Sequence, residues 1–323
     1  MRLRIKFSDF YQGRGFDPQD NFFTRLLRRR HEVEVRPDAE HLIFSRYGYD
    51  FLQHDGIRIF FTAENVRPNF DLCDYALAFD HLTFGDRYLR LPLYRYYEDA
   101  YAAVLAPPAP VTPDLAKRKF CSYVVSNRRT SRADSARVQF FQKLSAQRRI
   151  ESGGRQFNNV GGPVADKLGF LRGCKFNIAF ENASTPGYTT EKIIEAKAAG
   201  TVPIYWGNPL IATELNPRAF VNCHDFSDLD AAVRHVLTLD TDDAAYLAML
   251  AEPIFPGGVE PAELREAKLL DFLDHIFTQP VEQGYRRVRS GRWGRRVERE
   301  YRRVARFDVK YQAERLQRWL TGK

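Results

Sequence analysis

Residues 175–209 constrain the fold of this chain more than any other stretch. Their sequence, KFNIAFENASTPGYTTEKIIEAKAAGTVPIYWGNP, contains two apolar runs of strand length, 175–180 and 201–206. Between them, residues 191–199 are rich in Ala, Ile, Lys and Glu at helical spacing, and Gly200 suits the left-handed position that ends a helix. The pattern predicts a strand, a helix and a second strand, the repeating unit of an α/β domain.

The start of this helix is a predicted anion site. Thr189 or Thr190 can cap it, Glu191 suits the positive end of the helix dipole, and Lys192 in the first turn can reach a phosphate. In doubly wound α/β domains, ligands lie at the carboxyl ends of the strands, where helix N-termini present free N–H groups to anions. We therefore expect a nucleotide diphosphate here, with Glu191 on the ribose hydroxyls. The alternative is that Glu191 and Lys192 only solvate and cap the helix.

The rest of the chain also reads as α/β. Its 323 residues suit two domains. Strand and helix patterns alternate up to about residue 113, a Pro-rich break covers residues 106–117, and the alternation then resumes. We predict an N-terminal domain over 1–113, a C-terminal domain over 114–280 and a helical tail over 281–323.

Composition limits the cellular setting. No apolar run approaches the ~18 to 20 residues that span a bilayer, and the start MRLRIKFSDF turns polar too soon for a secretory signal, so we expect a cytoplasmic protein. Four cysteines are scattered without C-x-x-C pairing, which indicates small buried residues rather than a zinc site or disulfides. These are Cys73, Cys121, Cys174 and Cys223.

The stretch FENASTPGYTTEKIIEAKAAGTVPIYWGNP resembles the donor-binding signature of the α1,3/4-fucosyltransferases. Further segments resemble the same family, among them FFTAENVRPNFDLCDYALAFDHLTFGDRYLRLPLY and FCSYVVSNRRTSRADSARVQFFQKL, and the likeness covers roughly residues 2–277. It implies two Rossmann-like domains facing across a cleft, of the GT-B type. The first would hold the acceptor and the second the nucleotide sugar.

The resemblance also implies a reaction. Family members transfer L-fucose from GDP-β-L-fucose, with inversion, to a sugar hydroxyl. For this chain we expect the acceptor to be an N-acetylglucosamine-containing glycan and the product to carry an α1,3 linkage. The lack of secretory features points to a bacterial version. The residues leave the α1,4 linkage, another nucleotide-sugar donor and a non-catalytic binding protein open as alternatives.

An inverting transfer needs a base for the attacking hydroxyl, and we choose Glu64. It follows the strongly apolar run IRIFF, so it should stand at the carboxyl edge of a sheet. It also aligns with the proposed base of the family, although Ala63 stands where the family usually has Gly. Alternatively, Glu64 or Asn65 caps a turn before Pro68.

The departing diphosphate needs positive charge, and we choose Arg137 together with Lys192. Arg137 opens the helical segment ARVQFFQKL after a strand, so its guanidinium can fork onto phosphate oxygens. The family's phosphate-binding arginine precedes a pair of aromatic residues, as Arg137 does. Arg132 in the preceding loop stays open as an alternative.

Three further donor ligands rest on the resemblance. Asn182 is expected to bond the sugar or phosphate, Tyr188 to pack beside the pyrophosphate, and Glu181 to help position the fucose. No metal or other cofactor is expected. Asp228 and Asp230 form a D-x-D pair, but the pair precedes AAVRHVL and is typical of a helix start.

The basic residues are concentrated in the tail. Residues 285–323 contain 14 Lys or Arg and 4 Asp or Glu, a net charge of +10, so residues 1–284 carry −2 of the total +8. Between 293 and 311, apolar side chains share a ~120° arc of a helix that is otherwise rich in Arg, which favours a peripheral anchor on an anionic membrane, the inner face of the cytoplasmic membrane. Bacterial members of the family carry similar tails. Docking on protein and a nucleic-acid arm are the alternatives.

Overall fold

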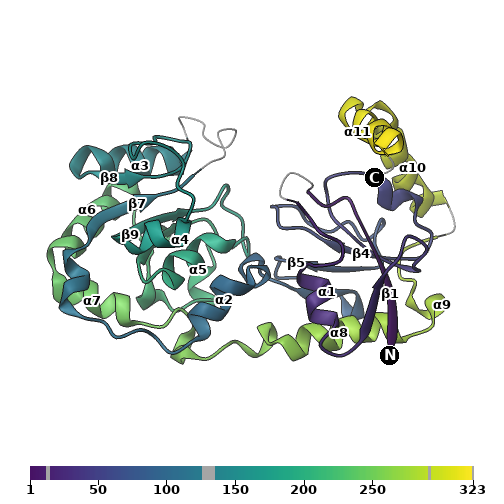
Figure 1. Cartoon of the computed structure of the whole chain (residues 1–323), viewed down its shortest axis with the longest axis horizontal. Helices are drawn as coiled ribbons and strands as arrows, with labels where there is room; N and C mark the ends of the chain where they lie inside the picture. The colour runs from purple at the N-terminus through teal and green to yellow at the C-terminus, as the bar shows by residue number, and fades with distance from the viewer. Residues whose placement is uncertain (12–14, 126–134, 290–291, 322–323) are drawn as a thin grey trace. The chain divides into compact units, whose positions relative to one another are not determined.

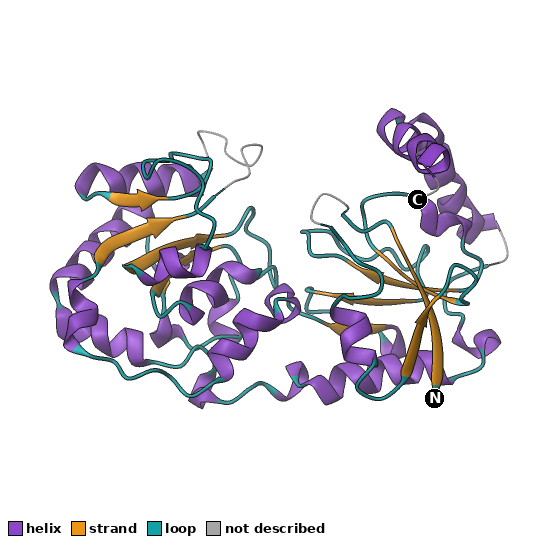
Figure 2. Cartoon of the chain, in the orientation of Figure 1, coloured by secondary structure: helices purple, strands orange, loops and turns teal. Residues whose placement is uncertain are grey.

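The computed structural model describes residues 1–11, 15–125, 135–289 and 292–321. It divides into two compact units (Figure 1). Unit 1 comprises Met1–Leu91 and Ala262–Lys323, and unit 2 comprises Pro92–Pro261. Each unit is built on one parallel sheet covered by helices (Figure 2), so the predicted α/β fold with two Rossmann-like units is confirmed.

Unit 1 contains a six-stranded parallel sheet in the order β2-β1-β3-β4-β5-β6. Its strands are β1 (Arg2–Ser8), β2 (Glu32–Val35), β3 (His41–Phe44), β4 (Ile57–Phe61), β5 (Tyr75–Ala78) and β6 (Tyr88–Arg90). After β1 the chain moves to β2 on one side and then to β3 on the other. The reversal places the topological switch point, where ligands of such sheets bind, at the carboxyl ends of β1 and β3.

Successive side chains of each strand point to opposite faces of this sheet, and both faces are covered by other parts of unit 1. On one face, His41 contacts Phe277 and Tyr75 contacts Phe272, both on the long helix α8. On the other face a separate apolar cluster contains Phe44 and further strand residues, with Val297 packed against it. The helices of unit 1 include α1 (Phe22–Leu27), the short 3-10 helix η2 (Asp50–Gln53), α8 (Glu266–Thr278), α9 (Val281–Gly284), α10 (Arg292–Phe307) and α11 (Val309–Thr321).

Unit 2 contains a five-stranded parallel sheet in the order β11-β10-β9-β7-β8. Its strands are β7 (Lys119–Tyr123), β8 (Ile150–Ser152), β9 (Cys174–Phe180), β10 (Val202–Trp206) and β11 (Val221–Asn222). The chain passes from β7 to β8 on one side and then to β9 on the other, so the switch point lies at the carboxyl ends of β7 and β9.

The helices of unit 2 cover both faces of its sheet. They are α2 (Glu98–Leu105), α3 (Ala136–Gln147), α4 (Lys167–Arg172), α5 (Glu191–Ala198), α6 (Leu229–Thr241) and α7 (Asp243–Ala251). Helices α3 and α6 pack together over the main apolar core, while α5 packs on β9 and β10 with α2 and α4 beside it. Gly200 follows α5 with φ of +68°, so the predicted helix stop is confirmed.

The unit boundaries differ from the predicted ones. Helix α2 packs on α5, so unit 2 begins at Pro92 and not at residue 114, and the Pro-rich break lies inside unit 2, where it forms the 3-10 helix Pro113–Lys117. Helix α8 belongs to unit 1, because Arg29 pairs with Glu266 and Arg30 pairs with Asp271. The Pro-rich composition predicted a break in regular structure but did not show which unit the segment joins.

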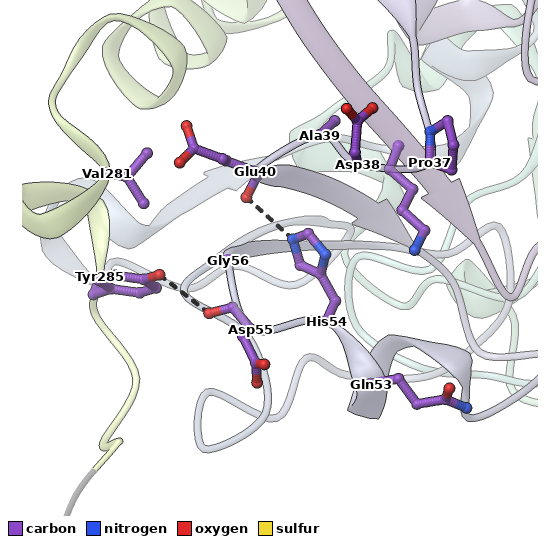
Figure 3. A pocket seen from close by; sticks show the side chains of 11 residues that line it. Pro37, Asp38, Ala39, Glu40, Gln53, His54, Asp55, Gly56, Val281 and Tyr285 are labelled. Atoms are coloured by element: carbon purple, nitrogen blue, oxygen red, sulfur yellow. Dashed lines mark hydrogen bonds between the residues drawn. The ribbon is translucent and has the colours of Figure 1, made fainter.

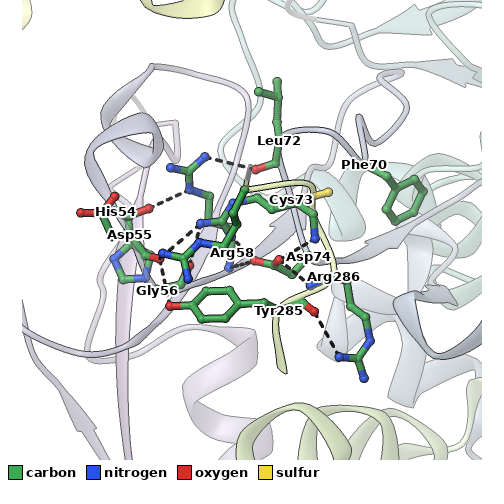
Figure 4. A network of polar contacts seen from close by, with 12 residues as sticks. His54, Asp55, Gly56, Arg58, Phe70, Leu72, Cys73, Asp74, Tyr285 and Arg286 are labelled. Carbon is green, nitrogen blue, oxygen red and sulfur yellow. Dashed lines mark hydrogen bonds and ion pairs between the residues drawn. The ribbon is translucent and has the colours of Figure 1, made fainter. Parts of the chain in front are cut away.

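The basic tail is docked on unit 1, one of the alternatives considered for it. At its start, the buried Asp74 carboxylate accepts the backbone N–H groups of Arg286 and Arg287 at 2.9 Å each and that of Arg58 at 2.8 Å (Figure 4). The Arg287 guanidinium also forms an ion pair with Asp74. The tail therefore begins as part of the body.

Helices α10 and α11 continue this docking. Glu298 pairs with the buried Arg58 at 3.2 Å, and the hydroxyl of Tyr311 donates to Asp50 at 2.7 Å. The predicted single apolar stripe is wrong, because the helix ends at Phe307 and Asp308 then caps α11 by accepting the backbone N–H of Tyr311. Among the described helices, none combines the length and apolarity needed to cross a bilayer.

All four cysteines are free and buried, as predicted.

Candidate active site

The predicted phosphate ligand Arg137 and the predicted donor ligand Asn182 meet at the switch point of unit 2. Arg137 lies in the first turn of α3, which follows β7, and Asn182 follows β9. Because β7 and β9 are adjacent parallel strands, their following segments meet at the same sheet edge, and an Arg137 Nη2 donates to Asn182 Oδ1 at 2.5 Å.

Arg137 is a buried cation that lacks a carboxylate partner among the described residues. It is 3% exposed, and its Nε makes no hydrogen bond. A buried charge without a counter-ion is costly, so this guanidinium favours an incoming anion. The alternative ligand Arg132 lies outside the described residues.

The first turn of α5 holds the second cation. Lys192 Nζ donates to Glu181 Oε2 and to the Thr190 hydroxyl, both at 2.7 Å. Glu181 also accepts the backbone N–H and the hydroxyl of Thr190, at 2.7 Å each. The Glu181 carboxylate thus ties the end of β9 to the start of α5, and its oxygens face protein groups, whereas the sequence suggested that it positions a sugar.

Charge is fixed at this helix start. Burial alone would raise the pKa of Glu191, but the nearby ammonium groups of Lys192 and Lys167 outweigh burial and lower this pKa to about 2. Burial and the like charge of Arg137 would lower the pKa of Lys192, yet the carboxylates of Glu181 and Glu191 raise this pKa above its usual value. Lys192 is therefore cationic and Glu191 anionic at neutral pH.

The helix N-terminus stays available to a ligand. Thr190 occupies the N-cap position, but its side chain makes no capping hydrogen bond and is bonded to Glu181 instead. Thr190 thus holds the predicted N-cap position, but the expected capping hydrogen bond is absent because the buried Glu181 carboxylate takes the hydroxyl. The first-turn N–H groups of α5 can accordingly donate to an anion.

Sequence reasoning missed two residues that hold this site together. Gly207 leaves room for Glu181, because a Cβ there would lie 2.4 Å from Glu181 Cγ. The buried Asn208 accepts the backbone N–H of Gly187 at 2.8 Å and donates to the Thr189 hydroxyl at 3.1 Å. Their position directly after the strand that ends in Trp206 is the signal that could have found them. Tyr188, predicted to pack beside a pyrophosphate, is 1% exposed within unit 2.

The D-x-D pair serves helix α6. Asp228 is the N-cap and accepts the backbone N–H of Ala231 at 2.7 Å, while both Asp230 oxygens accept from Lys143 at 2.8 Å. The two carboxylates are therefore engaged in a helix start and a surface ion pair. In the described part of the chain, no group of three or more His, Cys, Asp or Glu residues could hold a metal ion.

The predicted base Glu64 lies in unit 1, three residues beyond the carboxyl end of β4. The Tyr47 hydroxyl donates to Glu64 Oε1 at 2.7 Å. This places a carboxylate at the sheet edge that binds ligands in this fold class. Arg137, Asn182, Glu181 and Lys192 come together in unit 2, while Glu64 lies in unit 1.

Known proteins match both units. The model of the α-(1,3)-fucosyltransferase FucT N-terminal domain matches residues 5–97, and that of the C-terminal part of glycosyltransferase family 10 (fucosyltransferase) matches residues 115–251. A crystal structure of an α1,3-fucosyltransferase superposes with a TM-score of 0.74 at 30% identity, covering 86% of this chain and 90% of that one. The chain belongs to the α1,3-fucosyltransferase family.

Curated members of the family are similar over shorter stretches. α-(1,3)-Fucosyltransferase FucT of Helicobacter pylori is 38% identical over 226 residues, which is 60% of this chain and 46% of that protein. Human 3-galactosyl-N-acetylglucosaminide 4-α-L-fucosyltransferase FUT3 is 32% identical over 223 residues, 65% of this chain and 58% of that protein. The chain thus spans about half the length of these two relatives. A crystal structure of an α1,3-fucosyltransferase with GDP-fucose superposes with a TM-score of 0.72 at 30% identity, covering 86% of this chain and 91% of that one.

This fucosyltransferase-family chain also has an open pocket of about 350 Å³ in unit 1 (Figure 3). Most of its lining residues directly precede β3 or β4, at the amino edge of the sheet, and Val281 and Tyr285 of the tail complete it. There His54 bonds the carbonyl oxygen of Glu40 at 3.1 Å and Tyr285 donates to that of Asp55 at 3.1 Å (Figure 3). Burial lowers the pKa of His54 below its usual value. The Tyr285 contact joins the tail to unit 1 at this pocket. Glu64 follows β4 at the opposite, carboxyl edge of the sheet, so the pocket is not the site of Glu64 chemistry.

Proposed function

We propose that this protein transfers L-fucose from GDP-β-L-fucose, with inversion, to a hydroxyl of a lactosamine-type glycan and forms an α1,3 linkage. The observation that carries the proposal is Arg137, a buried guanidinium without a carboxylate partner among the described residues, bonded to Asn182 at a switch point. The names of the relatives agree with this donor and acceptor class.

The proposed mechanism divides the work between two sets of groups. Glu64 accepts the proton of the attacking acceptor hydroxyl as its oxygen bonds to the anomeric carbon. The bond to the diphosphate oxygen breaks at the same time, and Arg137, Lys192 and the N-terminus of α5 stabilise the negative charge of the departing GDP. Glu181 holds Lys192 in position, and Glu191 accepts from the ribose hydroxyls.

Donor binding tests this proposal. Arg137→Ala and Lys192→Ala should each weaken GDP and GDP-fucose binding by roughly 10- to 100-fold, since each removes a charged hydrogen-bond donor to phosphate. Isothermal titration calorimetry measures the effect. Lys143→Ala is the matched control, because Lys143 lies on the same helix as Arg137 but pairs with Asp230 at the surface. Wild-type affinity in either variant, or equal binding of UDP-sugars, would contradict the assignment.

The product tests the acceptor half of the proposal. With N-acetyllactosamine and GDP-fucose, we expect an α1,3-linked fucose on N-acetylglucosamine, identified by nuclear magnetic resonance of the purified product. An α1,4 product on an isomeric acceptor would contradict the stated linkage and leave the donor assignment intact.

We propose that the reaction needs no metal ion or other cofactor. Two side-chain cations and a helix N-terminus supply positive charge for the diphosphate, and the Asp228 and Asp230 carboxylates have other partners. Turnover should therefore persist in excess EDTA, measured as release of GDP. Complete loss of turnover that manganese restores would show that a divalent ion takes part.

We propose that the tail, while docked on unit 1, also attaches the protein to the inner face of the cytoplasmic membrane. Phe307 is 77% exposed and Val304 is 55% exposed on α10, and the surrounding Arg299, Arg303 and Arg306 are exposed. Exposed apolar side chains among arginines suit the boundary of an anionic bilayer.

Vesicle sedimentation tests the attachment. The intact chain should bind vesicles of phosphatidylcholine and phosphatidylserine, and less so with added salt, because charges are screened over about 10 Å at 0.1 M. The double change Val304→Ser and Phe307→Ser should weaken binding about tenfold, from the loss of buried apolar area. The control Val259→Ser alters an exposed valine of unit 2. If the double variant bound vesicles as well as the Val259→Ser control, the exposed face of α10 would not be the membrane-binding surface.

A further inference from the structure

Two exposed tyrosines lie at the switch point of unit 1. Tyr11 follows β1 and Tyr47 follows β3, the two strands whose carboxyl ends define that point. Tyr11 is 50% exposed and Tyr47 is 37% exposed, and their ring centroids are 5.2 Å apart. A single exposed aromatic side chain is ordinary on a protein surface, but a contacting pair at a ligand-binding position indicates a site.

The segment that carries Tyr47 is held rigidly by Asp9. The carbonyl oxygen of Asp9 accepts the backbone N–H of Tyr47 at 2.9 Å, and its carboxylate accepts those of Asp50 and Phe51 at 2.9 and 2.8 Å. Asp9 itself has a φ of +60°, and a Cβ at Gly48 would lie 2.3 Å from Asp9 Oδ1. The backbone at Tyr47 is thus fixed before any ligand arrives, which lowers the entropy cost of binding.

Tyr47 is also next to the proposed base. Its hydroxyl donates to Glu64 Oε1, and among the described residues no other side chain forms a hydrogen bond with the Glu64 carboxylate. The oxygen Oε2 is therefore the one that would take a proton. A base must lie within about 3 Å of the hydroxyl that it deprotonates, so the acceptor sugar must lie within a few ångströms of Tyr47.

We propose that Tyr11 and Tyr47 form the platform on which the acceptor sugar stacks. The C–H groups on the apolar face of a pyranose ring would contact the two rings, and its reacting hydroxyl would then face Glu64 Oε2. The inference rests on the proposed function, because it takes Glu64 as the base.

The experiment separates the rings from the hydroxyl of Tyr47. In Tyr11→Ala and Tyr47→Ala, KM for N-acetyllactosamine should rise roughly 10-fold, the effect of losing one aromatic contact. Tyr47→Phe keeps the ring, so its acceptor KM should stay within about twofold. In all three variants GDP binding, measured by calorimetry, and the thermal unfolding midpoint should be unchanged. Tyr301→Ala, which alters an equally exposed tyrosine (38%) on α10, is the matched control.

Each alternative outcome identifies what failed. An unchanged acceptor KM in both alanine variants overturns the platform, and so does a Tyr47→Phe variant as impaired in KM as Tyr47→Ala, since the hydroxyl and not the ring would then bind. Wild-type protein that binds GDP-fucose but transfers nothing to N-acetyllactosamine overturns the acceptor class and the platform with it. Failure of the donor assignment appears separately, as absence of GDP-fucose binding.

Discussion

Glu64→Gln lowers the rate of fucosyl transfer roughly 10²-fold or more, the expected result of removing a general base. The amide has the shape of the carboxylate and can still accept the hydrogen bond from Tyr47, so the local structure should persist. Only the proton acceptor disappears. Steady-state kinetics with GDP-fucose and a saturating acceptor measure the change in kcat.

The Glu64→Gln result can be assigned to the base only if donor binding is unchanged. GDP-fucose affinity of Glu64→Gln should match the wild type, because the donor-binding groups Arg137 and Lys192 lie in unit 2. Glu40→Gln is the control, since this exposed glutamate precedes β3 at the opposite edge of the sheet. Wild-type turnover in Glu64→Gln would remove Glu64 from the mechanism and leave the donor site as assigned.

Arg287→Met destabilises the protein by about 3–5 kcal/mol, the usual cost of removing one partner of a buried ion pair. Asp74 is 0% exposed, and the Arg287 guanidinium pairs with it, so the variant buries a carboxylate that has lost this ion pair. Methionine retains most of the side-chain volume, which limits the effect of a cavity. Urea unfolding followed by circular dichroism measures the change in free energy.

A double-mutant cycle separates the charge from the packing. Adding Asp74→Asn to Arg287→Met should recover part of the loss, because the double variant buries no unpaired charge. Arg299→Met, on the exposed side of α10, should change the free energy of unfolding by less than about 0.5 kcal/mol. Equal stability of Arg287→Met and Arg299→Met would show that the ion pair does not hold the tail.

The same contacts revise an expectation about truncation. The charge pattern alone suggests that a chain ending near Tyr285 would leave an intact body. The structure contradicts that view, because Asp74 would lose its bonds from Arg286 and Arg287, and the buried Arg58 would lose Glu298. Changes of exposed side chains in the full chain are therefore the better test of membrane attachment.

Local sequence signals determined much of the fold. The run from residue 175 to 209 predicted β9, α5 and β10 to within about a residue at each end, because apolar periodicity and a glycine with positive φ are local properties. Such signals also identified Asp228 as a helix cap and the cysteines as buried thiols. Arg137 and Lys192 were placed by local patterns that predict a helix start after a strand. Asn182 was placed by the family resemblance.

Only the tertiary structure decided which distant groups meet. Strand order and loops far apart in sequence decide three contacts of the site. They bury Arg137 without a carboxylate partner in the described chain, bond Glu181 to Lys192, and bring Tyr47 to Glu64. The docked tail is the clearest case. Its composition determined the charge and the helices, but the buried Asp74 that receives it lies more than 200 residues away. The composition of the tail determines its charge and its helices, whereas the packing of unit 1 determines that Asp74 is its partner.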